Sequence, residues 1–157
     1  MYKIFICFAM LFSACETEKK APVVNTVQDK LALLEMDSKF SDYSEEHGMH
    51  MAFLEFMDSN AVLLRPGHLP IVGAHAVDYL IGQDDAAYTL QWKTKDAMVA
   101  SGGDMGFTYG IWALKPKVQD TVLYGTYVSI WKKGANGKWK FVLDSGNEGI
   151  DAPAESL

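Results

Sequence analysis

The chain has few cysteines, no large cluster of positive charge and no apolar run long enough to cross a bilayer. Its only cysteines are Cys7 and Cys15, so the residues after position 15 hold neither a disulfide nor a thiol nucleophile. Lysine and arginine number 14 against 20 aspartates and glutamates, which gives a net charge of −6. Nucleic acids and anionic lipid surfaces require a concentrated positive face, so we expect neither as a partner.

Several motifs of catalysis and phosphate binding are also missing. No Gly-x-Ser-x-Gly elbow is present, so serine hydrolase chemistry has no support. The glycine-rich segment 101–106 lacks the Lys-Ser/Thr ending of a phosphate loop, which favours a hairpin turn there. His47 and His50 have a spacing that could share a metal on a helix face, but Gly48 is expected to interrupt that helix. We expect no metal site and no cofactor.

The first 14 residues have the composition of a secretion signal. Lys3 supplies a positive start, residues 4–12 are apolar and uncharged, and small residues precede Cys15. The sequence Phe12-Ser13-Ala14-Cys15 resembles the lipobox of bacterial lipoproteins, which implies cleavage before Cys15 and a lipid on its thiol. The implied localisation is the cell envelope, at its periplasmic or outer-membrane face. An ordinary secreted protein cleaved nearby is the alternative.

The rest of the chain has the length of one domain. We expect a tether over 15–25, a domain over 26–148 and a disordered tail over 149–157. Apolar residues at helical spacing predict helices at 27–46, 49–57 and 74–81. Aromatic and aliphatic runs between turn residues predict strands at 61–65, 88–100, 105–115, 121–133 and 138–146. The Asn136-Gly137 pair predicts a tight hairpin between the last two strands.

The order of these elements, together with three local motifs, resembles a known superfamily. The motifs are the strand 61–65 followed by Pro66-Gly67, Gly73 before the third helix, and Gly137-Lys138-Trp139 near the end. In these features the chain is similar to NTF2-like proteins, and among them to the SnoaL-like and DUF4440 relatives of ketosteroid isomerase. The resemblance implies an α+β cone, with three N-terminal helices packed on a curved, mainly antiparallel six-stranded sheet. This fold carries many unrelated functions, so it does not specify a reaction.

The resemblance also implies a candidate site inside the cone. Ketosteroid isomerases carry a carboxylate base just before a proline at the end of the first strand, where this chain has Arg65. Arginine stays protonated and cannot be that base, so steroid isomerase chemistry is not expected. A guanidinium at the mouth of an apolar cavity suits an anion, and a structural pair with Asp144 is the alternative. The candidate ligand-binding residues are Arg65, Tyr109, Trp112, Tyr127 and Asp144.

Three functions remain open on these residues. The first is a lipid-anchored module that binds a small, partly apolar ligand, with an anion as one option. The second is a SnoaL-like isomerase, dehydratase or hydrolase that uses Asp144 or His47 as its general base. The third is an adaptor whose outer sheet face binds a partner protein. Aromatic residues occur on both faces of the predicted strands and only one face can meet the helices, so we also expect a homodimer.

Overall fold

The computed structural model describes residues 26–154. The expected signal, the lipid-bearing Cys15 and the tether lie outside these residues. Within them, no helix is both long and apolar enough to cross a membrane. The elements are α1 (Thr26–His47), α2 (Met49–Phe56), β1 (Met57–Leu64), β2 (Ile71–Val72), α3 (Ala74–Ile81), β3 (Tyr88–Val99), β4 (Met105–Pro116), β5 (Leu123–Lys133) and β6 (Trp139–Ile150).

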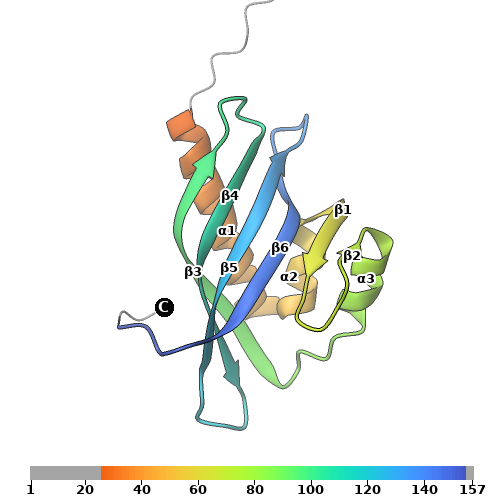
Figure 1. Cartoon of the computed structure of the whole chain (residues 1–157), viewed down its shortest axis with the longest axis vertical. Coiled ribbons are helices and arrows are strands. Elements are labelled where there is room, and N and C mark those ends of the chain that lie inside the picture. Colours follow the sequence, from red (N-terminus) through yellow and green to blue (C-terminus); the bar gives the residue numbers. More distant parts are fainter. Residues whose placement is uncertain (1–25, 155–157) are drawn as a thin grey trace, which may run out of the picture.

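The six strands form a single sheet in the order β2-β1-β6-β5-β4-β3. Neighbouring strands are antiparallel except for β1 and β6, which run parallel. Helices α1 and α2 cover one face of this sheet, and α3 lies beside β1 and β2 (Figure 1). The space between the helices and the sheet holds the core and the candidate pocket.

The α+β class and the sheet agree with the sequence analysis, but the positions of four elements need correction. Helix α3 follows β1 and β2, so the three helices are not all N-terminal. Strand β2 was not predicted because two residues cannot show a periodicity. Strand β1 begins at Met57, earlier than expected, and its register with β6 is irregular between Met57 and Val62. Strand β6 continues to Ile150, which pairs with Tyr124, so the domain extends into the tail expected from 149.

Two glycines explain where elements end. Gly48 separates α1 from α2 with a φ of 92°, and a Cβ there would lie 2.8 Å from an oxygen of Asp85. Gly137 has a φ of 78° in the turn between β5 and β6, where its amide bonds to the carbonyl of Gly134 at 2.9 Å. Residues that carry a side chain rarely adopt a positive φ, whereas glycine does so readily. The Asn136-Gly137 pair therefore predicted the hairpin correctly.

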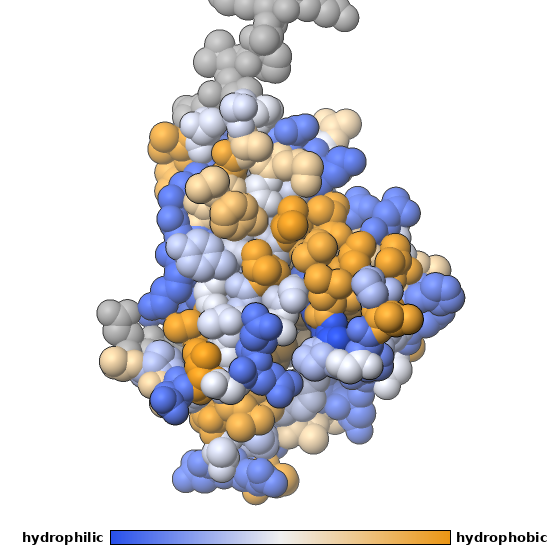
Figure 2. All heavy atoms as spheres, in the orientation of Figure 1, coloured by the Kyte–Doolittle hydropathy of each residue, from blue (hydrophilic) through white to orange (hydrophobic). Residues whose placement is uncertain are grey.

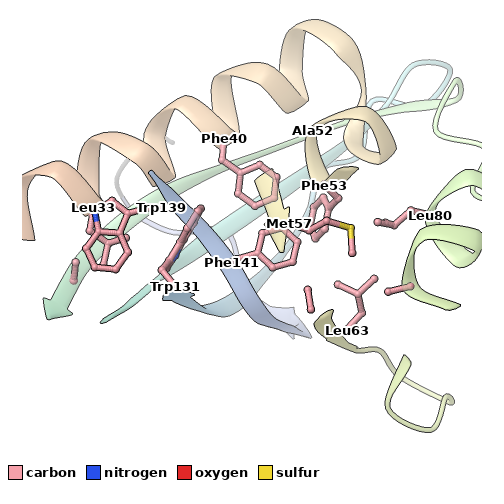
Figure 3. Close-up of a cluster of buried hydrophobic side chains, with 13 residues drawn as sticks. Leu33, Phe40, Ala52, Phe53, Met57, Leu63, Leu80, Trp131, Trp139 and Phe141 are labelled. Carbon is pink, nitrogen blue, oxygen red and sulfur yellow. The ribbon is translucent and has the colours of Figure 1, made fainter. Parts of the chain in front are cut away.

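The core is built around Phe40 of α1, which is almost fully buried. Its ring centroid lies 4.9 Å from that of Phe53, 5.5 Å from that of Phe141 and 4.6 Å from that of Trp92. Figure 3 shows the rings of Phe40, Phe53 and Phe141 converging between the layers, with Trp131 further along the sheet. Aromatic packing of this kind joins α1, α2 and three strands into one unit.

The opposite face of the sheet carries an apolar row that crosses every strand. The register aligns its members from one edge to the other as Val72, Val62, Leu143, Ile130, Phe107 and Met98. Val72 is 48% exposed and Met98 is 61% exposed, so the ends of this outer row reach solvent. Figure 2 shows apolar side chains gathered on this face over β6, β1 and β2.

Candidate ligand-binding pocket

A pocket of about 260 Å³ lies between the inner face of the sheet and the helices. Strands β3, β4, β5 and β6 contribute its floor, and residues of all three helices contribute its roof. Most of its lining is aromatic or aliphatic, and its charged residues are Arg65, Asp144 and Glu148. The residues that line it include Arg65, Tyr88, Leu90, Trp92, Trp112, Tyr127, Ser129, Asp144, Gly146 and Glu148.

The polar end of the pocket is an ion pair between Arg65 and Asp144. Arg65 follows β1 and Asp144 lies in β6, and the parallel pairing of these strands brings them together. Arg65 Nη2 donates to Asp144 Oδ1 at 2.7 Å, while its Nη1 donates to the carbonyls of Leu64 and Asp144. The other carboxylate oxygen accepts a hydrogen bond from Ser129 Oγ at 2.7 Å. Both charged groups therefore have partners within the chain, which is the structural pairing that the sequence left open.

Behind the pocket wall lies a carboxyl group that the sequence analysis missed. Asp37 of α1 is fully buried and accepts hydrogen bonds at 2.5 Å from Tyr127 Oη and from Thr94 Oγ1. Its other oxygen, Oδ1, has no hydrogen-bond partner among the described residues. The ring of Tyr127 lines the pocket while its hydroxyl points to this carboxyl. Asp37 thus fixes the orientation of a pocket residue from behind.

Burial raises the pKa values of both Asp37 and Tyr127. It raises the pKa of Asp37 above its ordinary value of 3.8, although the hydrogen bonds from Thr94 and Tyr127 oppose the shift. Burial and the neighbouring Asp37 also raise the pKa of the Tyr127 hydroxyl far above its ordinary range. Tyr127 therefore stays protonated, and it can act as a hydrogen-bond donor but not as a base.

The sequence contained a signal for Asp37 that a search for catalytic motifs overlooks. Asp37 lies four residues after Leu33 and three before Phe40, so it falls on the buried stripe of α1. A carboxylate at such a position is costly unless it is hydrogen-bonded, and its presence predicts polar partners inside the core.

Two serines on the same helix fasten the pocket wall. Ser41 Oγ accepts from the backbone amide of Trp92 and donates to its carbonyl, both at 2.8 Å. Ser44 Oγ donates to the carbonyl of Leu90 at 2.7 Å. These bonds hold α1 against β3, the strand that carries both pocket residues.

Glycines make room for Trp112 in the floor of the pocket. A Cβ at Gly125 would overlap the indole of Trp112, so the ring occupies the space above this glycine. A Cβ at Gly146 would lie 3.5 Å from Trp112 Nε1, which is ordinary van der Waals contact. The indole therefore extends from β4 across β5 toward β6.

Two of the residues proposed from the sequence lie away from this pocket. Tyr109 does not line it; its side chain is on the outer face of β4, where the residue is 45% exposed and packs near Phe107. His47 ends α1 with about half of its side chain exposed, and it contacts Tyr43 and Glu46. The structure therefore brings Arg65, Trp112, Tyr127 and Asp144 together and leaves Tyr109 and His47 out.

The second histidine of the candidate metal pair has a different partner. His50 Nδ1 lies 2.9 Å from Asp85 Oδ2, which also accepts the backbone amide of His50. Among residues 26–154, no three His, Cys, Asp or Glu side chains are grouped as metal ligands would be.

Comparison with known proteins identifies the fold. No family model and no curated protein matches the sequence. A ketosteroid isomerase-like protein from Erwinia carotovora is similar with a TM-score of 0.60 and 16% identity over 77% of this chain and 97% of that one. An NTF2-like protein of unknown function from Pseudomonas putida has a TM-score of 0.66 and 8% identity over 80% of this chain and 90% of its own.

A third similar structure is an NTF2-like superfamily protein from Salmonella enterica, with a TM-score of 0.62 and 11% identity. It is matched over 82% of this chain and 96% of its own length. Identities this low establish the arrangement of helices and strands but no shared ligand or reaction. The chain therefore has the NTF2-like, ketosteroid isomerase-like fold that the order of its sequence elements predicted.

Proposed function

We propose that this chain is an exported, lipid-anchored domain of SnoaL-like type that binds a small, partly apolar molecule in its cone. The observation that carries the proposal is the pocket of about 260 Å³, with its aromatic walls and its few polar groups. Small-molecule sites typically combine an apolar lining with a few convergent polar groups, in volumes of roughly 300–1,000 Å³. The volume here lies just below that range, which favours a small ligand.

Neither of the two general bases proposed from the sequence, Asp144 and His47, is available to a substrate in the pocket. The carboxylate of Asp144 is held by Arg65 and Ser129, and His47 lies outside the pocket. A general base needs an acceptor that reaches the substrate unpaired, and neither residue offers one. The charge of Arg65 is likewise paired, so an anionic ligand would have to displace Asp144.

The experiment compares the small molecule retained by the wild type with that retained by a variant whose pocket is filled by a larger side chain. Gly146→Leu places a side chain in the pocket where its Cβ meets no close contact, while Ser145→Leu adds the same side chain on the opposite face. Native mass spectrometry of protein from its own host should show a retained small molecule in the wild type and in Ser145→Leu. Gly146→Leu should lack it. Equal retention by both variants would show that the ligand binds elsewhere, and an empty wild type would contradict ligand binding itself.

The lipid anchor rests on the signal-like composition of residues 1–14 and the lipobox resemblance at Cys15. Cys15→Ser should move the protein from the membrane fraction to the soluble fraction, because the acyl chains are its proposed anchor. Ser13→Thr, which leaves the cysteine in place, is the matched control. A Cys15→Ser protein that stays with membranes through a salt wash would contradict the anchor.

A further inference from the structure

One row of inward-facing residues crosses four strands in the floor of the pocket. The strand register aligns Trp92 of β3, Trp112 of β4, Gly125 of β5 and Glu148 of β6. Trp92, Trp112 and Glu148 all line the pocket. We call these four residues the aromatic–carboxylate row.

The geometry of this row brings an indole toward a carboxylate. Neighbouring strands lie about 4.8 Å apart, so Trp112 and Glu148 are separated by the width of a single strand. That strand carries Gly125 at this position, and the Trp112 ring occupies the space a side chain would have filled. The ring also reaches Gly146, which precedes Glu148 by two residues on the same face of β6. The indole and the Glu148 side chain are therefore neighbours on the pocket floor.

The negative charge of Glu148 has no positively charged partner among the described residues that line the pocket. Arg65 is the only lysine or arginine among the described residues that line the pocket, and its charge is paired with Asp144. Glu148 lines the pocket but is exposed, and it forms no hydrogen bond or ion pair with any residue in the range 26–154. With one cation against two carboxylates, the lining carries a net negative charge.

Tyr88, another residue of the pocket lining, lies near further negative charge. Burial raises the pKa of the Tyr88 hydroxyl, and the nearby carboxylates of Asp85 and Asp84 raise it further. These aspartates precede β3 and add negative charge beside this wall, although Asp85 also bonds to His50. An anion would be disfavoured here, and a cation would be attracted.

We propose that the aromatic–carboxylate row binds the ammonium group of an organic cation whose apolar body occupies the rest of the pocket. This inference rests on the proposed ligand-binding function and names its ligand class. The face of a tryptophan attracts a cation more strongly than any other side-chain ring, and the attraction grows when water is excluded. A quaternary or alkylated ammonium suits this row because it needs a negative surface but few hydrogen-bond acceptors.

The test uses three probes of similar size that differ in charge. They are benzyltrimethylammonium, neopentylbenzene, in which carbon replaces the quaternary nitrogen, and the anion phenylacetate. Binding is followed by quenching of tryptophan emission and by saturation-transfer NMR. We expect the cation to bind about tenfold more tightly than its neutral isostere, and phenylacetate to bind most weakly.

Substitution of Glu148 tests whether the cation binds at this row. Glu148→Gln should weaken binding of benzyltrimethylammonium about threefold, as expected for an exposed ion pair, and leave neopentylbenzene unchanged. Glu46→Gln, at the exposed end of α1, is the matched control and should change neither affinity. Trp112→Leu should weaken the cation more than the neutral probe.

The outcomes separate this inference from the proposed function. Tighter binding of neopentylbenzene or phenylacetate than of the cation would overturn the inference while supporting a ligand-binding pocket. Cation binding that Glu148→Gln and Trp112→Leu both leave unchanged would also overturn it. Failure of all three probes to bind would count against the inference and the proposed function together.

Discussion

Asp37 couples the stability of the domain to pH through a fully buried carboxyl group. Because burial raises its pKa in the folded state, the folded chain keeps this proton to a higher pH than the unfolded chain does. The contribution of the proton to stability is complete below the unfolded pKa and is lost as the pH rises through the folded pKa.

Asp37→Asn should therefore flatten the dependence of stability on pH. The amide keeps the shape of the side chain and an acceptor for Tyr127, but it has no proton to lose. We expect the unfolding free energy of the wild type, measured in urea, to fall relative to that of the variant as the pH rises above about 4. Parallel curves between pH 4 and pH 8 would show that Asp37 does not titrate in this range.

The Arg65–Asp144 pair predicts a stability effect rather than a binding effect. Only 19% of the Arg65 side chain and 8% of the Asp144 side chain are exposed, so removing one partner leaves a buried charge. We expect Arg65→Met to lower the unfolding free energy by about 3 kcal/mol, as for a broken buried pair. The double variant Arg65→Met/Asp144→Leu should recover most of this loss. A loss below about 1 kcal/mol, typical of an exposed pair, would instead support an arginine that waits for a ligand.

For single residues, the sequence predicted which side chains line the pocket better than it predicted their roles. Arg65 and Asp144 were recognised as potential partners although 79 residues separate them. Tyr109 was misplaced because aromatic residues occur on both faces of β4 and the inward face was not determined by pattern alone. Glu148 was missed because an exposed glutamate near the end of a strand looks like a solvent residue until the register is known.

Helix α1 and strand β3 depend on each other through a few side-chain hydrogen bonds. Ser41→Ala removes the acceptor of the Trp92 amide and leaves that buried group unsatisfied. We expect a loss of about 1–3 kcal/mol in unfolding free energy, together with a shift in the Trp emission maximum. Ser38→Ala, on the exposed side of the same helix, is the control and should stay within about 0.5 kcal/mol of the wild type. Equal effects of the two substitutions would mean that the Ser41 hydroxyl does not fasten the strand.

The long elements were predictable because each repeats its signal over many residues. Helix α1 and strands β3 to β5 were placed within a few residues by periodicity and by turn signals such as Gly102-Gly103 and Asn136-Gly137. The pairing of β1 with β6 could not be predicted from the sequence pattern of either strand. It depends on which edge of the sheet remains free. Short β2 and the extension of β6 to Ile150 come from that same tertiary pairing.

The whole domain is expected to pair with a copy of itself through the outer row of the sheet. The row crosses six strands with exposed ends and a half-buried centre, and a two-fold axis would bury it against itself. Ile130→Lys, at the centre of the row, should halve the mass measured by light scattering. Thr126→Lys, on the same face of the same strand but outside the row, should remain a dimer. A wild type that scatters as a monomer at tens of micromolar would contradict this pairing.

The position of β6 has a consequence for how the chain is made. β6 is the last strand in the sequence, yet it lies between β1 and β5. Until it emerges, β1 and β2 have no strand that joins them to β3, β4 and β5, so the sheet stays in two parts during synthesis. Joining them closes a loop of more than seventy residues, which makes this step slow compared with the local hairpins. A premature stop before Trp139 would therefore remove the centre of the sheet rather than its edge, and the partial chain would expose β1 and β5 to proteases.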